Sequence, residues 1–110
     1  MTGSLRPDDR VLLLGIPSHR ELVSIARVLI RGALVALGTR EEVDQARAEM
    51  AEFDNAMFVE AQPDCIPWRD QFFTKVLVPH HLEPLLAPFA DELQRLLAPD
   101  GQIVRLTEQA

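Results

Sequence analysis

A pattern that occurs twice in the first half of the chain constrains its fold most strongly: a short apolar run, a glycine and the start of a helix. The runs read "VLLLG" and "ALVALG". After the first, Ser18 and Glu21 have the spacing of a capping box, which satisfies the open hydrogen-bonding groups at a helix start. After the second, Thr39 and Glu42 have the same spacing. A strand that leads directly into a helix, twice over, predicts right-handed crossovers and a parallel sheet.

Both predicted helices carry apolar side chains on one face. In the first, Gly32 stands where a left-handed residue would end the helix. In the second, the face opposite the apolar stripe is charged. The inward positions are Leu22, Ile25, Ala26 and Leu29 in the first helix and Val43, Ala46, Met50 and Phe53 in the second.

The rest of the chain continues the alternation of strands and helices. "NAMFVEA" predicts a third strand, residues 61–71 a loop, "FFTKVLV" a fourth strand and "QIVRL", after a "PDG" turn, a fifth. The main helix before that turn starts at about Pro88, because proline disrupts a helix interior but is tolerated in the first turn. Its inward residues are Phe89, Leu93, Leu96 and Leu97.

This order of elements predicts an α/β fold in three layers, with a doubly wound, mainly parallel, five-stranded sheet in the order 3-2-1-4-5. The first two helices would cover one face and the helix around Leu93 the other. The carboxyl ends of the first and fourth strands then lie beside the topological switch point, where such folds bind ligands. We expect one domain over residues 1–110, with residues 1–9 as a flexible N-terminal segment.

Composition limits the partners and the compartment. The net charge of −6 disfavours nucleic acid, whose phosphates repel an acidic chain. No apolar run is long enough for a membrane span, and the start of the chain lacks the apolar region of a signal peptide. The single cysteine, Cys65, fits a reducing compartment and is expected to be a packed or loop thiol rather than a nucleophile. We therefore expect a cytoplasmic protein with no nucleic-acid or membrane partner.

Four segments, in order and at suitable spacing, resemble the core of class I S-adenosylmethionine-dependent methyltransferases. They are "RVLLLG", "ALVALGTREEVDQAR", "FVEAQPDCIPWRDQFFTKVLV" and "ELQRLLAPDGQIV". The third is similar to the family's pattern of an acidic residue, an "LPF"-like loop, an aromatic residue and a strand, and the last to its "L-x-P-G-G" turn. The resemblance covers most of the chain and implies a Rossmann-like, minimal methyltransferase core.

The chain departs from the family's pattern in the loop after the first strand. The family has an acidic residue in that strand, where this chain has Leu13, and then a G-x-G-x-G loop. Gly15 is kept, but Pro17 and His19 replace the later glycines. Proline removes an amide donor and fixes φ, and histidine adds a side chain where the family has none. Thr74 stands where the family commonly has an aspartate before the fourth strand.

Further departures concern the acidic residues that hold the cofactor. Gly38 ends the second strand, where the family usually has an acidic residue on the ribose hydroxyls. The acidic residue after the third strand is kept as Glu60, unless the alignment falls on Ala61. The resemblance thus implies cofactor contacts from Gly15, Gly38 and Glu60 only. We expect tight binding to be lost and no cofactor to be held, except S-adenosylmethionine if the chain is an active enzyme.

Histidines are the remaining candidates for chemistry. His80 lies where related enzymes place substrate-side residues after the fourth strand, which makes it a weak candidate for acid–base catalysis. His19, His80, His81 and Glu60 all fall near predicted strand ends and could converge. No two of the histidines have the spacing of a helical metal site, so no metal site is predicted.

The loop after the third strand holds the chain's one tryptophan. Trp68 is expected to pack this loop onto the sheet, although stacking on an adenine ring is an alternative. Arg69 and Asp70 beside it are expected to be solvated. No catalytic role is assigned to any of these residues.

Two functions from different classes agree with these features, and whether the chain is an enzyme stays open. The first is a methyltransferase-like domain without tight cofactor binding or catalysis, acting as a binding or interaction module. Because the sequence stops soon after the fifth strand, where family members continue, we expect homodimerisation through the exposed strand-five half of the sheet. The alternative is an active small S-adenosylmethionine-dependent methyltransferase with a modified cofactor site. A third possibility is a nucleotide binder of unrelated chemistry, but this chain lacks the G-x-G-x-x-G fingerprint of such proteins. The sequence indicates no substrate.

Overall fold

The computed structural model describes residues 5–61, 66–79 and 87–106 as an alternation of strands and helices. The elements are β1 (Arg10–Leu14), α1 (His19–Val28), β2 (Ala33–Gly38), α2 (Arg40–Glu49), β3 (Ala56–Glu60), β4 (Phe73–Pro79), the 3-10 helix η2 (Ala87–Phe89), α3 (Ala90–Leu96) and β5 (Leu97–Leu106). Three of the residues singled out from the sequence, Cys65, His80 and His81, lie outside the described residues. Within the described part of the chain, no helix is long and apolar enough to cross a membrane.

All five strands belong to one sheet in the order β3-β2-β1-β4-β5, and each neighbouring pair is parallel. The predicted fold class and strand order are therefore confirmed. β1 lies in the middle, and Val11, Leu12, Leu13 and Leu14 are all buried because both faces of this strand are covered.

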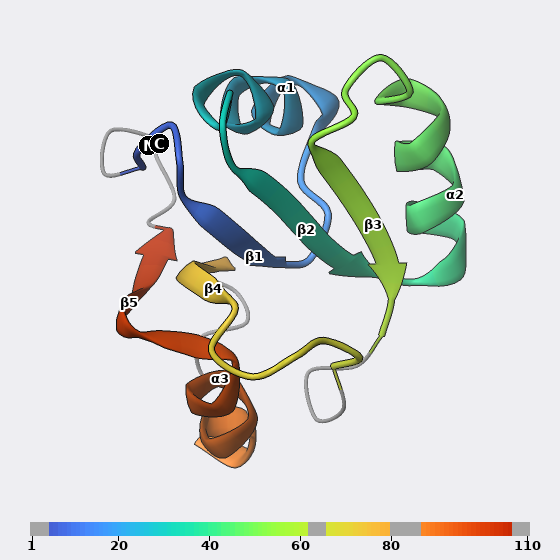
Figure 1. Cartoon of the computed structure of the whole chain (residues 1–110). Helices are drawn as coiled ribbons and strands as arrows, with labels where there is room; N and C mark the ends of the chain where they lie inside the picture. Colours follow the sequence, from blue (N-terminus) through green and yellow to red (C-terminus); the bar gives the residue numbers. More distant parts are fainter. Residues whose placement is uncertain (1–4, 62–65, 80–86, 107–110) are drawn as a thin grey trace.

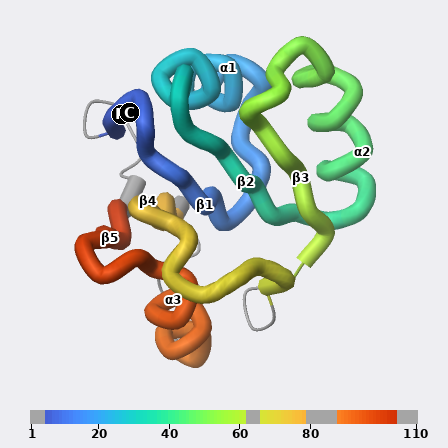
Figure 2. The backbone as a smooth tube through the Cα atoms, in the orientation of Figure 1, coloured from blue at the N-terminus to red at the C-terminus, as the bar shows by residue number. Residues whose placement is uncertain are grey.

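The layers are also as predicted: α1 and α2 cover one face of the sheet and α3 the other (Figure 1; Figure 2). Val11 and Leu13 pack with the apolar stripes of α1 and α2. Leu12 and Leu14 point the other way and pack with Leu93 of α3. Successive residues of β1 thus enter opposite cores, as the pleat of a strand requires.

Both helix starts lie where the capping sequences predict them. Ser18 Oγ accepts a hydrogen bond from the Glu21 N–H at 3.3 Å, and α1 begins at the next residue. Thr39 Oγ1 accepts one from the Glu42 N–H at 3.3 Å, and the Glu42 carboxylate in turn accepts from the Thr39 N–H at 2.9 Å. The reciprocal bond completes the capping box of α2.

Gly32 has a different role from the one predicted. Helix α1 ends at Val28, and Gly15 is the one glycine with a positive φ among the described residues, so Gly32 is not a left-handed helix end. Instead, a Cβ atom at position 32 would overlap the carbonyl oxygen of Asp9. Glycine is needed here because two backbone segments pass very close to each other.

The C-terminal elements differ from the prediction at their boundaries. α3 starts at Ala90, after the 3-10 turn, and β5 follows it at Leu97 without a loop. Leu97 pairs with Phe73, and the register then shifts so that Gln102 pairs with Lys75. Residues 98–101, with the "PDG" turn, therefore bulge out of β5, and the predicted strand "QIVRL" pairs with β4 as the second part of it.

Residues just before β1 hold the start of this strand in place. Leu5 belongs to the core on the side of α1 and α2, and Asp9 is buried. Asp9 accepts hydrogen bonds from the Arg6 N–H and the Thr74 hydroxyl, each at 2.8 Å, and lies 3.5 Å from Lys75 Nζ. The N-terminal segment that the sequence predicts to be flexible thus contains two packed residues.

Candidate functional site

The candidate site lies at the carboxyl edge of the sheet, where β1, β2 and β3 end side by side (Figure 1). Gly15 follows β1 with a φ of 114°, a conformation that favours glycine. Gly38, the last residue of β2, pairs in register with Glu60, the last residue of β3. The fold therefore brings the three predicted cofactor-binding residues to one edge, and Glu60 is exposed there.

The side chain of Ile16 fills the space beside Gly38. A Cβ atom at position 38 would lie 2.8 Å from Ile16 Cδ1 and 3.0 Å from Ile16 Cγ1, closer than normal van der Waals contact. Ile16 is half-buried and packs against the core formed with α1 and α2. An acidic side chain at position 38 would therefore require Ile16 to move. Sequence reasoning missed this contact, since nothing in the local pattern pairs residues 16 and 38.

The carboxylate beside Gly38 takes part in the cap of α2. Glu42 Oε1 would lie 3.0 Å from a Cβ at position 38, and the same atom accepts the hydrogen bond from the Thr39 N–H. The other carboxylate oxygen of Glu42, Oε2, accepts no hydrogen bond from the described residues, and the side chain is exposed. The cap of α2 thus engages the carboxylate nearest the end of β2 through one oxygen.

The turn from β1 into α1 lacks one backbone donor, because Pro17 has no N–H. The Ser18 hydroxyl accepts the N–H of Glu21 and can still donate its own hydrogen. His19, the first residue of α1, is exposed, and its Nδ1 lies 3.8 Å from Glu49 Oε1 on α2. A helix start can bind anions through its free N–H groups, but this one is partly capped from within.

The sequence predicts that three histidines could converge with Glu60, and the structure describes only one of them, His19. Its charged neighbour is Glu49 rather than Glu60. His80 and His81 lie outside the described residues. Over residues 5–61, 66–79 and 87–106, no three His, Cys, Asp or Glu side chains lie close enough together to hold a metal ion.

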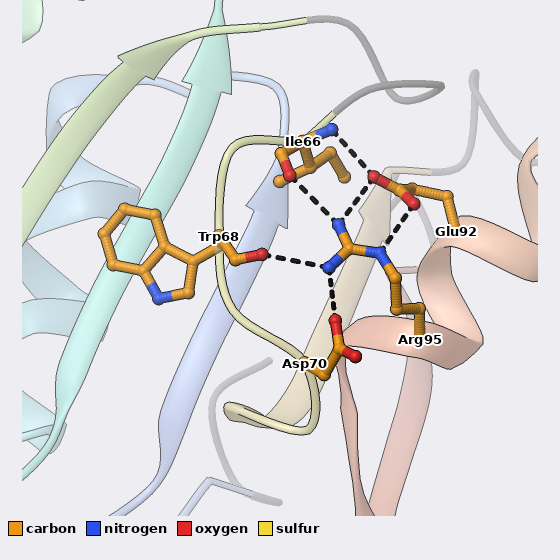
Figure 3. A network of polar contacts seen from close by, with 5 residues as sticks. All are labelled: Ile66, Trp68, Asp70, Glu92 and Arg95. Carbon is orange, nitrogen blue, oxygen red and sulfur yellow. Dashed lines mark hydrogen bonds and ion pairs between the residues drawn. The ribbon is translucent and has the colours of Figure 1, made fainter.

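Arg95 of α3 binds the chain between β3 and β4, whose described residues 66–72 we call the crossover segment (Figure 3). Its guanidinium donates to the carbonyl oxygens of Trp68 at 3.0 Å and Ile66 at 3.1 Å, and pairs with Asp70 at 2.6 Å. The Glu92 carboxylate accepts two hydrogen bonds from the guanidinium at 2.8 Å and one from the Ile66 N–H at 2.9 Å. One arginine thus ties three points of the crossover segment to α3.

These contacts change the pKa values of both charged partners. Hydrogen bonds from Arg95 and then from the Ile66 N–H lower the pKa of Glu92 from 4.5 to about 2. Hydrogen bonds to Glu92 and then to Asp70 raise the pKa of the Arg95 guanidinium. Asp70 is exposed, as expected, and its carboxylate also pairs with Arg95. In the sequence, the spacing of Glu92 and Arg95 by three residues indicates that these two side chains pair. Nothing in the sequence indicates their contacts with the crossover segment.

Trp68 packs the crossover segment onto the sheet, as expected. Its ring centroid lies 5.7 Å from that of Phe72 and 5.9 Å from that of Phe73, and Trp68 is half-buried against the core on the α3 side. Arg69 is exposed, but its guanidinium lies over the Phe72 ring, 4.8 Å from the centroid. The expected exposure of Arg69 is thus confirmed, and its guanidinium in addition contacts an aromatic ring.

Comparisons with known proteins point to one fold. No protein-family model and no curated protein sequence matches the chain. A SAM-dependent methyltransferase from Aquifex aeolicus superposes with a TM-score of 0.79 and 20% sequence identity, over 94% of this chain and 57% of its own. Geranyl diphosphate C-methyltransferase from Streptomyces coelicolor, in complex with Mg²⁺, geranyl diphosphate and S-adenosyl-L-homocysteine, gives a TM-score of 0.78 and 17% identity, over 94% of this chain and 40% of its own.

Coclaurine N-methyltransferase, bound to N-methylheliamine and S-adenosyl-L-homocysteine, gives a TM-score of 0.74 at 13% identity, over 90% of this chain and 30% of its own. At such low identity these likenesses concern the fold. The strand order, the layers and the superpositions agree with one another. The chain therefore has a class I methyltransferase-like fold, and it spans 57% or less of the length of each of these three methyltransferases.

Proposed function

We propose that this chain is a methyltransferase-like domain that has lost tight S-adenosylmethionine binding and catalysis, and that it acts as a binding or interaction module in a homodimer. The contact of Ile16 with Gly38 carries the proposal. An apolar side chain lies beside Gly38, at the strand end where the resemblance to methyltransferases implies a carboxylate for the ribose hydroxyls, and this supports the proposed loss. The residues at this edge of the sheet do not fit the family's way of holding the cofactor.

The size of the expected loss follows from the missing contacts. A ligand with micromolar affinity is held by about 8 kcal/mol. A hydrogen bond to a charged group contributes about 1.5–3 kcal/mol. Without the ribose carboxylate and one loop donor, about 4 kcal/mol is lost, which leaves an affinity near millimolar. Pro17, which has no N–H to donate, supports this estimate.

Support for dimerisation comes from the difference between the two edges of the sheet. On the β3 edge, Arg47 Nη2 donates to the Phe58 carbonyl oxygen at 2.9 Å, so this edge is partly blocked by the chain's own side chain. β5 forms the other edge, and Ile103, which pairs with Val76 of β4, is 38% exposed there. We place the dimer contact on the β5 half because an edge strand with an exposed apolar residue favours association.

The second candidate function is enzymatic: the chain would be an active small S-adenosylmethionine-dependent methyltransferase with a modified cofactor site. Two observations favour it. Gly15 has a positive φ, as glycines often do where a backbone approaches a ligand closely, and Glu60 is exposed at the end of β3. Substrate binding would then need help from the partner subunit.

Ligand-dependent thermal unfolding and calorimetry separate these two functions. A ligand at a hundred times its Kd stabilises the folded state by about 2.7 kcal/mol, which shifts Tm by several degrees in a domain of this size. We expect no such shift with S-adenosylmethionine or S-adenosylhomocysteine at millimolar concentration. Micromolar binding in calorimetry would contradict the proposed loss and support the enzyme. Light scattering tests the dimer, and a monodisperse monomer at micromolar concentration would contradict it.

A further inference from the structure

We propose that a groove beside α1 binds an acidic helical segment of a partner protein. The groove lies between α1 and the turn that follows α2, and it has a volume of about 580 Å³. Its lining includes Arg20, Val23, Arg27, Glu52 and Phe53. This site is separate from the Ile16–Gly38 contact, and its occupation does not depend on whether the chain binds S-adenosylmethionine.

Two arginines give the groove its charge. Arg20 and Arg27 are exposed on α1, and they lie two helical turns apart, which corresponds to about 10 Å along the axis. Neither guanidinium forms an ion pair or hydrogen bond with any of the residues that the structure describes. The chain as a whole carries a net charge of −6, so a positive groove is a local exception. A partner with negative groups would be attracted here and repelled elsewhere.

Two apolar side chains, Val23 and Phe53, also line the groove. Val23 lies one turn after Arg20 on the same helix and is half-buried. Phe53 contributes from the turn after α2, is half-buried and packs against the core of α1 and α2. A ligand that covers these side chains gains apolar burial in addition to charge pairing.

The spacing of these groups indicates what kind of ligand fits. Satisfying both arginines requires two negative groups about 10 Å apart, with an apolar group between them. A helix with acidic residues two turns apart and an aliphatic residue one turn after the first has this arrangement on one face. A small ligand with a single carboxylate or phosphate could pair with only one of the arginines. Glu52 on the lining is the one repulsive element for such a partner.

A synthetic helical peptide with two glutamates spaced by two turns around a leucine serves as the probe, and fluorescence anisotropy at low salt measures binding. We expect a Kd below about 100 µM, which rises with salt because exposed charges are screened. The double variant Arg20→Glu/Arg27→Glu should weaken binding by about tenfold or more. Glu52→Gln should tighten it by about twofold or more, because it removes a like charge. Circular dichroism checks that the variants are folded.

The matched control is Arg6→Glu/Arg40→Glu, which makes the same change in net charge at exposed arginines away from the groove. It should leave the affinity within about twofold. The proposal is wrong if the peptide does not bind below millimolar concentration, if the control weakens binding as much as the groove variant, or if a peptide with lysines in place of the glutamates binds equally. Arginine-dependent binding of a single-stranded oligonucleotide without binding of the peptide would also overturn it.

Discussion

The guanidinium of Arg95 and the carboxylate of Asp70, 2.6 Å apart, join α3 to the crossover segment between β3 and β4. Arg95 is one-third exposed, yet it also binds Glu92 and two carbonyl oxygens of the segment. Replacing Arg95 by Met keeps the length of the side chain and removes every donor. We expect a Tm lower by several degrees, because the Trp68 carbonyl loses its contact with Arg95 and the Ile66 carbonyl and Glu92 are each left with one backbone N–H as partner. Arg40→Met, at an exposed arginine of α2, is the control in the same melting experiment and should change Tm far less.

Acid should destabilise the fold between pH 4.5 and about 2. The pKa of Glu92 is lowered from 4.5 to about 2 in the folded chain, so its contribution is present above the unfolded value and is lost as pH falls through the folded value. Asp9 acts in the same direction: burial alone would raise its pKa, but hydrogen bonds from Arg6 and Thr74 and the charge of Lys75 lower it overall.

Denaturant titrations at a series of pH values measure this dependence. Glu92→Gln should flatten the loss of stability in that pH window, since the amide does not titrate. Glu41→Gln, an exposed glutamate on α2, is the matched control. Equal slopes for the wild type and Glu92→Gln would show that Glu92 does not carry the effect.

Gly32→Ala should destabilise the chain by about 2 kcal/mol or more, because the new methyl group would overlap the backbone oxygen of Asp9 and one of the two segments must shift. Gly38→Ala should cost less, since the atoms it meets first belong to the side chain of Ile16, which can rotate. Chemical denaturation of both variants tests the order. A smaller loss at position 32 than at position 38 would contradict it.

A double-mutant cycle tests the contact behind the proposed function. Gly38→Asp alone should destabilise the fold, and Ile16→Ala should relieve the clash, with a coupling of about 1 kcal/mol or more between the two changes. The double variant also supplies a carboxylate at the end of β2. We expect it to bind S-adenosylhomocysteine about tenfold or more tightly than the wild type does in calorimetry. Additive effects on stability would mean that Ile16 does not restrict position 38.

The two sheet edges allow a paired test of dimerisation. Ile103 on β5 and Met57 on β3 are exposed to nearly the same extent, 38% and 37%. Ile103→Lys should dissociate the dimer, because it puts a charge into the proposed contact, and Met57→Lys should not. Sedimentation at matched concentrations measures both. Dissociation by Met57→Lys alone would move the contact to the other edge.

The elements with local signals could be predicted from the sequence, and those formed by distant contacts could not. Ser18 and Thr39 identify the starts of α1 and α2 because a cap involves neighbours in the chain. The apolar positions of both helices follow from periodicity, and the strand order follows from the alternation of strands and helices. The start of β5 at Leu97 could not be predicted from the sequence, because it depends on pairing with the distant residue Phe73.

The same difference holds within the candidate site. Gly15, Gly38 and Glu60 could be placed at one edge, because each ends or follows a strand of a parallel sheet. The contact of Ile16 with Gly38 joins two different turns, and no local pattern encodes it.

Trp68 is the single tryptophan of a chain without tyrosine, so the intrinsic fluorescence excited at long wavelength comes from one indole. That indole lies beside Phe72 and Phe73, in the segment that Arg95 holds against α3. The wavelength of its emission maximum therefore reports whether this segment is packed against α3 and the sheet. A red shift that precedes the loss of helical ellipticity during unfolding would mean that the crossover detaches before the sheet and its helices come apart.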